Sequence, residues 1–286
     1  MDRGVRYGKG VGCCEDRGGG TYYKMKLLVC IKQVLDSNIP LHIDEASGRV
    51  IPEGPPKYWM NHADEFAVEE AVRIKESLSG TVLDVLTVGP DRTAQVLERA
   101  IGMGADTAVH IHAPEEASPT PLTLAAWIGA FARNRGYDLI LTGVMAEDDM
   151  QGQVGPLLAE YLDMPCATSV IFETVCPPKG VVYVEREIEN GRRHMLELDL
   201  PAVLTVQTGI NHPRYPTLSN LIRARKEKPF RLDSAELGPL EVREKILRAH
   251  TPGKSREGRL LQGDRREKAV QLLEILKREG LLQTGE

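Results

Sequence analysis

Short apolar runs alternate with segments of helical periodicity between residues 27 and 206. The apolar runs, which we expect to be strands, span residues 27–32, 82–88, 108–112, 138–142 and 202–206. Apolar positions at helical spacing predict helices over residues 61–78, 93–103, 122–133 and 151–162. The strands are too uniformly apolar to bury only one face. The pattern therefore predicts a parallel sheet covered by helices on both faces.

The rhythm changes after Pro165. Three consecutive runs have strand character and cover residues 168–174, 181–188 and 193–198. Gly180 and the pair Asn190-Gly191 lie between them as turn signals. We therefore expect an antiparallel ribbon at the edge of the parallel sheet. A polar hairpin is predicted earlier, over residues 39–43 and 49–51.

The two ends of the chain differ from this middle part. Residues 1–24 hold seven of the 27 glycines and no periodic apolar pattern. We expect them to be a disordered extension, with Met25 as the natural start and residues 25–208 as the α/β domain. Residues 209–264 have little core potential of their own, and a helix is expected near residues 265–282. A long segment of that kind is expected to lie on another surface.

Composition and charge narrow the class of protein. A formal net charge of −5 and a pI near 5.9 disfavour a nucleic-acid binder, which carries a basic face. No apolar run approaches the roughly 20 residues that span a bilayer. The five cysteines form no C-x-x-C pair, so we expect free thiols in a reducing cytoplasm. His110 and His112 share a strand face, but without a third ligand they predict no metal site.

No catalytic motif stands out, so the candidate chemistry lies in loops at the carboxyl ends of the predicted strands. The strongest is the loop over residues 143–156 (GVMAEDDMQGQVGP). Gly152 and Gly155 let a ligand approach the backbone, and a helix start favours phosphate. Asp148 and Asp149 suit ribose hydroxyls. The same loop is equally typical of a helix with a stabilising acidic first turn, and both interpretations stay open on this loop alone.

Several motifs follow one another along the chain. The first strand ends in a V-x-x-K pattern, and residues 61–73 (NHADEFAVEEAVR) are typical of a helix that an Asn initiates. Further motifs are residues 100–106 (AIGMGAD), the Asp-rich loop, residues 184–188 (VEREI), residues 200–205 (LPAVLT) and residues 211–220 (NHPRYPTLSN). Together these motifs resemble the beta subunit of electron transfer flavoproteins, and residues 211–220 are the most diagnostic of them. The resemblance extends from Met25 to the C-terminus, in order and with similar spacing.

The resemblance implies a Rossmann-like, doubly wound α/β fold of the adenine-nucleotide alpha-hydrolase type, with an antiparallel ribbon and an extended C-terminal arm. Residues 25–208 would bind a nucleotide, and residues 209–286 would carry a docking loop and an arm that packs on an alpha subunit. The chain would be an electron-carrier subunit without catalytic residues, in a heterodimer whose alpha subunit holds most of the redox FAD. Its electron-transfer partners would be acyl-CoA-type dehydrogenases or a membrane quinone oxidoreductase.

The resemblance also implies site residues by position. The nucleotide pocket would comprise Cys30, Asn61, His62, Ala63, Asp64, Val88, Gly143, Met145, Ala146, Asp148, Asp149, Gln151, Gly152, Gln153 and Val154. The docking surface would comprise Arg214, Tyr215, Leu218, Arg223 and Lys226. Leu218 is its expected apolar anchor, although in isolation this leucine suggests a helix-start residue that covers local core.

The nucleotide itself stays open between AMP and a second FAD. Family members that bind AMP carry Asn and Thr where this chain has Gly152 and Val154, and this departure favours a second FAD with possible electron bifurcation. Asp149 and Met150 fit the bifurcating loop poorly. A free-standing adenine-nucleotide sensor of the universal-stress type is the alternative function. The long segment after Thr208 disfavours that sensor, and no S-G-G-x-D-S motif supports an adenylating enzyme.

Overall fold

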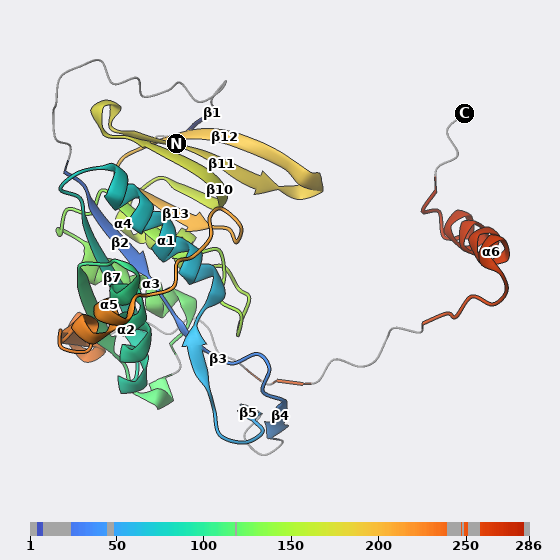
Figure 1. Cartoon of the computed structure of the whole chain (residues 1–286), viewed down its shortest axis with the longest axis horizontal. Coiled ribbons are helices and arrows are strands. Elements are labelled where there is room, and N and C mark those ends of the chain that lie inside the picture. The colour runs from blue at the N-terminus through green and yellow to red at the C-terminus, as the bar shows by residue number, and fades with distance from the viewer. Residues whose placement is uncertain are drawn as a thin grey trace. The chain divides into compact units, whose positions relative to one another are not determined.

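The computed structural model describes residues 5–7, 24–44, 49–117, 119–238, 247, 249–250 and 258–282. Its centre is a ten-stranded sheet in the order β1-β12-β11-β10-β13-β9-β2-β7-β8-β14 (Figure 1). The strands are β1 (Val5–Tyr7), β2 (Lys26–Cys30), β7 (Val82–Gly89), β8 (Thr107–His112), β9 (Leu139–Gly143), β10 (Cys166–Cys176), β11 (Val181–Ile188), β12 (Arg192–Asp199), β13 (Ala202–Val206) and β14 (Phe230–Asp233).

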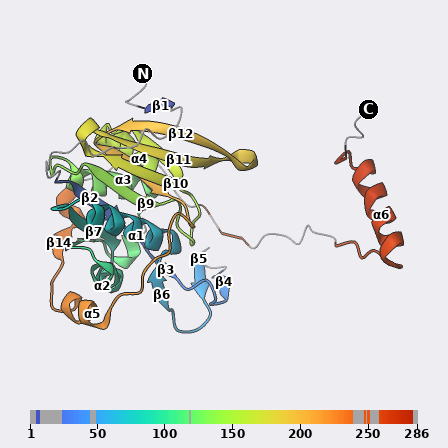
Figure 2. The same ribbon diagram turned by 45° about the horizontal axis from the view of Figure 1, so that its top comes forward.

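The sheet combines a parallel part with an antiparallel ribbon, as the sequence predicts. The neighbouring strands from β10 through β13, β9, β2, β7 and β8 to β14 all pair in parallel. Strands β10, β11 and β12 pair antiparallel, and the β11–β12 end projects beyond the sheet (Figure 2). Because β10 belongs to both parts, the ribbon continues the sheet without a break.

Helices cover both faces of the parallel strands. Helices α1 (His62–Ser77) and α2 (Ala94–Met103) lie on one face, and α3 (Pro121–Ala132) and α4 (Val154–Leu162) lie on the other (Figure 1). Strand β2 shows why its residues are uniformly apolar. Leu27 and Val29 pack into the core cluster under α1, whereas Leu28 and Cys30 pack into the cluster under α3 and α4. A strand buried on both faces has no polar side.

The chain reverses direction across the sheet between β2 and β9. From β2 the chain moves outward through β7 to β8, then returns through α3 to β9 on the other side of β2. Loops that follow β2 and β9 therefore diverge onto opposite faces, and we expect a crevice at the carboxyl ends of these strands. Such a switch point is where open α/β sheets bind ligands.

Most predicted elements are confirmed to within about two residues, but the start of α4 is wrong. The helix was expected from residue 151, yet it begins at Val154. Met150 and Gly152 have φ angles of 52° and 61°, which interrupt a right-handed helix. Asn61, expected as a helical residue, lies just before α1 as its N-cap.

The sequence pattern missed four short elements of the body. Strands β3 (Gln33–Leu35) and β6 (Tyr58–Met60) pair with each other, α5 (Leu218–Ala224) packs on α2, and β14 pairs with β8. Residues 209–238 therefore continue the sheet domain, which differs from the expectation that this stretch has little core potential.

Two statements about the N-terminal extension and the cysteines also need correction. Strand β1 pairs antiparallel with β12, so the extension is not disordered throughout; residues 1–4 and 8–23 lie outside the described residues. The expectation of free thiols is confirmed for Cys30 and Cys166, but Cys176 forms a disulfide. Cys13 and Cys14 lie outside the described residues.

Outside the sheet, β4 (Leu41–Asp44) and β5 (Arg49–Pro52) form the predicted hairpin as a two-stranded sheet. Helix α6 (Arg265–Arg278) belongs to a separate unit, and a capping box between Asp264 and Glu267 begins it. No helix of the described part of the chain is long and apolar enough to cross a membrane.

Candidate functional site

The Asp64 carboxylate lies between the ends of β2 and β9, at the switch point where the crevice is expected. This buried side chain lies in the first turn of α1 and accepts two backbone N–H bonds. One comes from Lys32, just after β2 (2.7 Å between N and Oδ2), and the other from Gly143, at the end of β9 (2.9 Å between N and Oδ1). Burial raises the pKa of Asp64 to about 7, although these hydrogen bonds act in the opposite direction. A single side chain thus joins the ends of both strands at the switch point.

Asn61 fixes the loop that follows β9. Its amide nitrogen donates to the carbonyl of Met145 (2.9 Å), and its amide oxygen accepts from the N–H of Glu147 (3.0 Å). Within the loop, the N–H of Met150 donates to the carbonyl of Ala146 (2.8 Å). Asn61 is 1% exposed, so it acts as a buried strut that holds the loop rather than as a group on the surface of the crevice.

Lys32, just after β2, forms ion pairs with Asp148 and Asp149 of the loop that follows β9. Its Nζ lies 2.6 Å from Asp148 Oδ1 and 3.0 Å from Asp149 Oδ2. Burial lowers the pKa of Lys32, but the attraction and hydrogen bonds of the two carboxylates outweigh that effect and raise it overall. The acidic residues therefore do not belong to the first turn of a helix. They belong to a loop held against β2, which removes the alternative interpretation of this segment.

Three glycines make these close approaches possible, each for a different reason. A Cβ on Gly143 would lie next to Asp64 Oδ1, so only glycine allows the Asp64 contact. Gly152 has φ 61°, a conformation that favours glycine, and a Cβ built there would make a close contact with the Val144 carbonyl oxygen at 3.2 Å. Gly155 was expected to face a ligand, but a Cβ there would meet the side chains of Thr205 and Thr142. Gly155 thus lets α4 pack closely on the sheet.

The other predicted pocket residues fall into two groups. Cys30 and Ala63 are buried at the ends of β2 and α1, and burial together with Asp64 raises the pKa of the Cys30 thiol. Val88 lies on β7, one strand further from β9 than β2 is. The exposed or half-exposed group surrounds the crevice loop and consists of His62, Met145, Ala146, Gln151, Gln153 and Val154.

Lys32 is not among the pocket residues that the resemblance implies. The signal was present, since the V-x-x-K pattern ends the first strand next to the expected ligand edge. Opposite charges attract, so a lysine at that edge is a natural partner for the Asp-Asp loop.

His110 has a structural role, as expected: its Nε2 lies 2.9 Å from the Gly89 carbonyl and 3.1 Å from Thr93 Oγ1. The described residues contain no cluster of three metal-ligating side chains.

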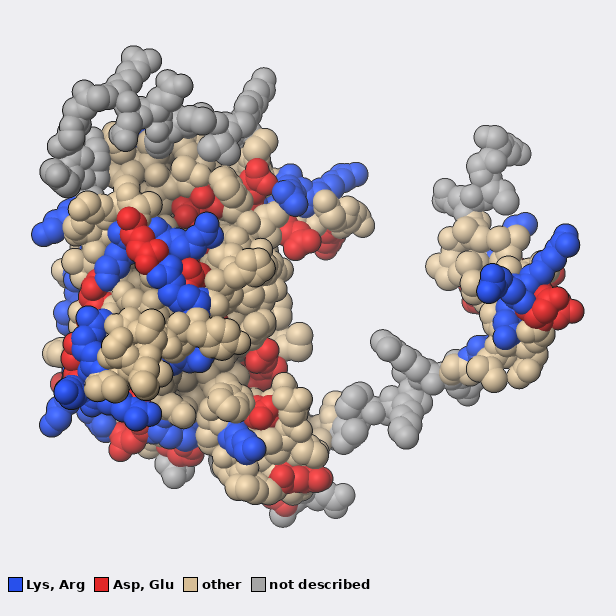
Figure 3. All heavy atoms as spheres, viewed as in Figure 1, with Lys and Arg blue, Asp and Glu red and all other residues tan. Residues whose placement is uncertain are grey.

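The predicted docking residues lie around α5, away from the crevice. Tyr215 is 88% exposed and Leu218 is 74% exposed, so Leu218 does not cover local core. The Thr217 hydroxyl caps the helix by accepting from the N–H of Asn220 (3.3 Å). Lys and Arg side chains gather at the end of the molecule that carries α2 and α5 (Figure 3). Arg223 and Lys226 are exposed in this region, and Arg223 lies 3.9 Å from Glu227.

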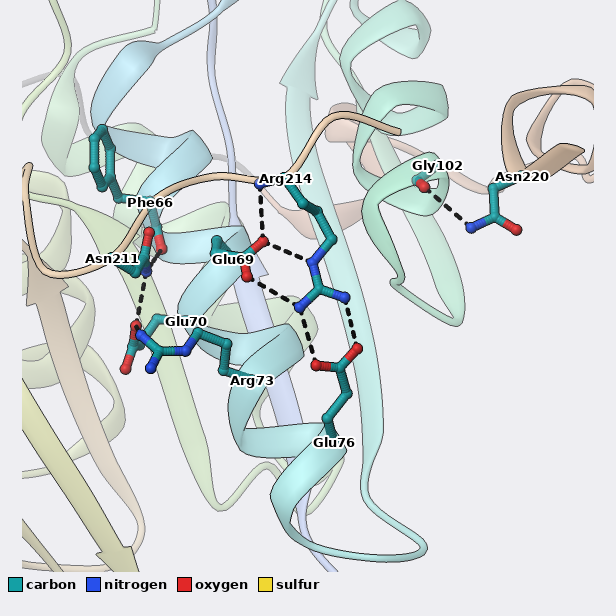
Figure 4. A network of polar contacts seen from close by, with 9 residues as sticks. All are labelled: Phe66, Glu69, Glu70, Arg73, Glu76, Gly102, Asn211, Arg214 and Asn220. Carbon is teal, nitrogen blue, oxygen red and sulfur yellow. Dashed lines mark hydrogen bonds and ion pairs between the residues drawn. The ribbon is translucent and has the colours of Figure 1, made fainter. Parts of the chain in front are cut away.

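Arg214 differs from the other docking residues because its guanidinium is already engaged. It forms ion pairs with Glu69 (2.9 Å between Nε and Oε2) and Glu76 (2.6 Å between Nη1 and Oε1), both on α1 (Figure 4). The hydrogen bonds to Glu76 and Glu69 raise the pKa of Arg214 above its ordinary value.

Fold and site together describe a doubly wound α/β protein with a candidate ligand edge at the switch point and an exposed Leu218 at the start of α5, which packs on α2. Comparison with known proteins then identifies its family: the chain belongs to the electron transfer flavoproteins. The model of the Electron transfer flavoprotein domain matches residues 50–236.

Three similar proteins are all named as the beta subunit of an electron transfer flavoprotein. The chain is 34% identical to the electron transfer flavoprotein subunit beta of Bacillus subtilis (strain 168) over 264 residues, which cover 89% of this chain and 98% of that protein. It is 35% identical to the mitochondrial subunit beta of Oryza sativa subsp. japonica, with coverage of 83% and 93%. Identity to the Bos taurus subunit beta is also 35%, with coverage of 75% and 84%. The resemblance found in the sequence is thereby confirmed.

Proposed function

We propose that this chain is the beta subunit of a heterodimeric electron transfer flavoprotein whose alpha subunit holds the redox FAD. In this proposal the chain binds an adenine nucleotide in the switch-point crevice and docks dehydrogenases through α5. It carries electrons as part of the heterodimer and supplies no catalytic residue. Membership of the family favours this role over a free-standing nucleotide sensor.

One observation carries the nucleotide assignment: Asp148 and Asp149 form ion pairs with Lys32 at the point where the chain changes direction across the sheet, between β2 and β9. The two carboxylates exceed the one ammonium by a negative charge, so they favour hydroxyl donors such as those of a ribose. Phosphates would lie at the other end of the loop, near Gly152 and the start of α4. The first N–H groups of a helix have no partner within the helix and attract anions.

The geometry at Gly152 favours a second FAD over AMP. Gly152 has no side chain, so a ligand would have access to the loop backbone at this position, and its φ of 61° suits glycine. A diphosphate needs that access along more of the loop than a single phosphate does. A second flavin here would support bifurcation of electron pairs in the heterodimer.

The nucleotide content of the purified heterodimer tests this assignment. We expect two FAD molecules per heterodimer, measured from the visible spectrum and the protein concentration, and no AMP in a heat extract analysed by chromatography. One FAD and one AMP per heterodimer would retain the crevice as a nucleotide site and reject the second FAD. An extract with one FAD and no other nucleotide would reject the crevice as a nucleotide site.

The docking assignment rests on exposure and charge at α5. Tyr215 and Leu218 project from a short segment in which Pro213 and Pro216 restrict the backbone. An exposed leucine among basic residues suits a partner with an apolar pocket and an acidic rim. An acyl-CoA-type dehydrogenase or a membrane quinone oxidoreductase is the proposed partner.

A further inference from the structure

The segment that carries Tyr215 and Leu218 is attached to the body at three separate points. At its start, the Asn211 amide donates to Glu70 Oε2 (2.7 Å) and to the Phe66 carbonyl (2.9 Å) (Figure 4). In its middle, Arg214 binds Glu69 and Glu76. Beyond Leu218, the Asn220 amide donates to the Gly102 carbonyl of α2 (3.3 Å). The attachments thus lie on both sides of the exposed residues.

The middle attachment is the strongest, since all three nitrogens of the guanidinium take part. Nε donates to Glu69 Oε2 and Nη2 to Glu69 Oε1, while Nη1 and Nη2 reach the two oxygens of Glu76 (Figure 4). The backbone N–H of Arg214 also donates to Glu69 Oε2 (3.1 Å). Glu69 is 5% exposed, and a buried carboxylate requires such a partner. Bidentate pairs of this kind fix orientation as well as position.

Gly102 of α2 allows Pro216 and Leu221 to pack closely on the helix backbone. A Cβ built on Gly102 would lie 2.8 Å from Pro216 Cβ and 2.9 Å from Leu221 Cδ2. These two residues flank Leu218, and Ala224 at the end of α5 is buried. The docking segment therefore rests on the bare backbone of α2 while Arg214 holds it from α1.

We propose that Arg214 is a positioning residue, which holds the segment 215–219 in its docking conformation and does not itself contact the partner. This inference rests on the proposed docking function and differs from the direct partner contact that the resemblance implies for Arg214. A segment ordered before the encounter loses less conformational entropy on binding, so Leu218 can act as a rigid anchor. Arg214 thus acts through Leu218.

A double-mutant cycle on the intact heterodimer tests the proposal. The readout is flavin reduction by a substrate-reduced acyl-CoA dehydrogenase, with the apparent KM for that partner measured separately from kcat. Leu218→Ala is expected to raise KM roughly thirtyfold, which corresponds to about 2 kcal/mol for an apolar anchor. Arg214→Gln is expected to raise KM about tenfold with kcat unchanged. The double variant should resemble Leu218→Ala alone, because residues that act through one contact are not additive.

Additive effects in the double variant, with KM raised about three hundredfold, would overturn the proposal and make Arg214 a direct contact. An unchanged KM for Leu218→Ala would instead reject docking through α5.

Two further variants test whether general destabilisation explains the effect of Arg214→Gln. Glu76→Gln removes only the exposed half of the ion-pair network, and Gly102→Ala displaces Pro216 without a change of charge. Both should raise KM, and amide hydrogen exchange over residues 214–221 of the free heterodimer should accelerate in each. Unchanged exchange in Arg214→Gln would also contradict a positioning role.

Discussion

At the scale of single residues, two buried side chains at the switch point form hydrogen bonds to the backbone of the protein and so fix the shape of the surrounding loops. Asp64 joins the ends of β2 and β9, and Asn61 holds the loop between Met145 and Glu147. The sequence interpretation placed both residues in the pocket because they match family positions. Their buried hydrogen bonds assign them a more specific role: they shape the loop that a nucleotide would contact.

Gly152 is the residue at which the identity of the nucleotide can be tested. We expect Gly152→Asn to lower the FAD content of the heterodimer and to raise AMP in the extract, because the added amide would restrict access of a diphosphate to the loop backbone. Asn tolerates left-handed backbone better than other residues with a Cβ, so the fold should persist. The matched control is Gly152→Ala, which adds the Cβ without the amide. Equal FAD loss in both variants would point to backbone strain and contradict a specific effect of the amide.

At the scale of elements, the apolar strands were predictable because burial on both faces leaves no polar positions. The start of α4 was not predictable in the same way, since it depends on positive φ angles at Met150 and Gly152. Strand β14 and helix α5 were missed for another reason. Each is short, and its position follows from pairing with β8 or contact with α2, distant in the chain, and not from a local period.

The packing of α4 on the sheet gives a prediction at this scale. A Cβ on Gly155 would meet Thr205 Cγ2 and would lie 3.1 Å from Thr142 Oγ1. We expect Gly155→Ala to push α4 away from β13 and to cost about 1–3 kcal/mol of unfolding free energy. Thr205→Ser removes the methyl group and keeps the hydroxyl that accepts from the N–H of Ser169. The double variant should recover much of the stability in urea unfolding; no recovery would contradict this account of Gly155.

At the scale of the whole molecule, one helix supports both candidate sites. Helix α1 contacts the loops of the switch-point crevice at its start and the segment that carries Tyr215 and Leu218 further along. The first turn of α1 carries Asp64 for the crevice, and its later turns carry Glu69, Glu70 and Glu76 for the docking segment. The sequence predicted α1 as a helix and both sites by resemblance. It did not indicate this shared support, because ion pairs between positions about 140 residues apart leave no local pattern.

We expect the stability of the folded chain to depend on pH through Glu173, a carboxylate of β10 that faces Glu70 of α1. Glu173 of β10 and Glu70 line a cavity of about 290 Å³ together with Arg73, and Glu173 Oε2 has no hydrogen-bond partner among the described residues. Burial and then repulsion by Glu70 raise the pKa of Glu173 well above its ordinary value, while Arg73 opposes the shift. The folded chain therefore binds a proton that the unfolded chain releases. The resulting stabilisation is fully present below the unfolded pKa and is lost as pH rises through the folded pKa.

We expect Glu173→Gln to remove this dependence, because an amide keeps the shape of the protonated carboxyl and does not ionise. Urea unfolding of the heterodimer should show a smaller loss of stability for the variant than for the wild type between about pH 5 and pH 8, the interval between the unfolded and the raised folded pKa of Glu173. The variant should also be the more stable of the two at the alkaline end. Asp64, whose pKa burial raises to about 7, leaves a residual slope of the same sign. Glu189→Gln, at an exposed position of the same ribbon, is the matched control and should retain the full slope. An unchanged slope in Glu173→Gln would show that Glu173 is ionised in the folded protein and would reject the raised pKa of Glu173.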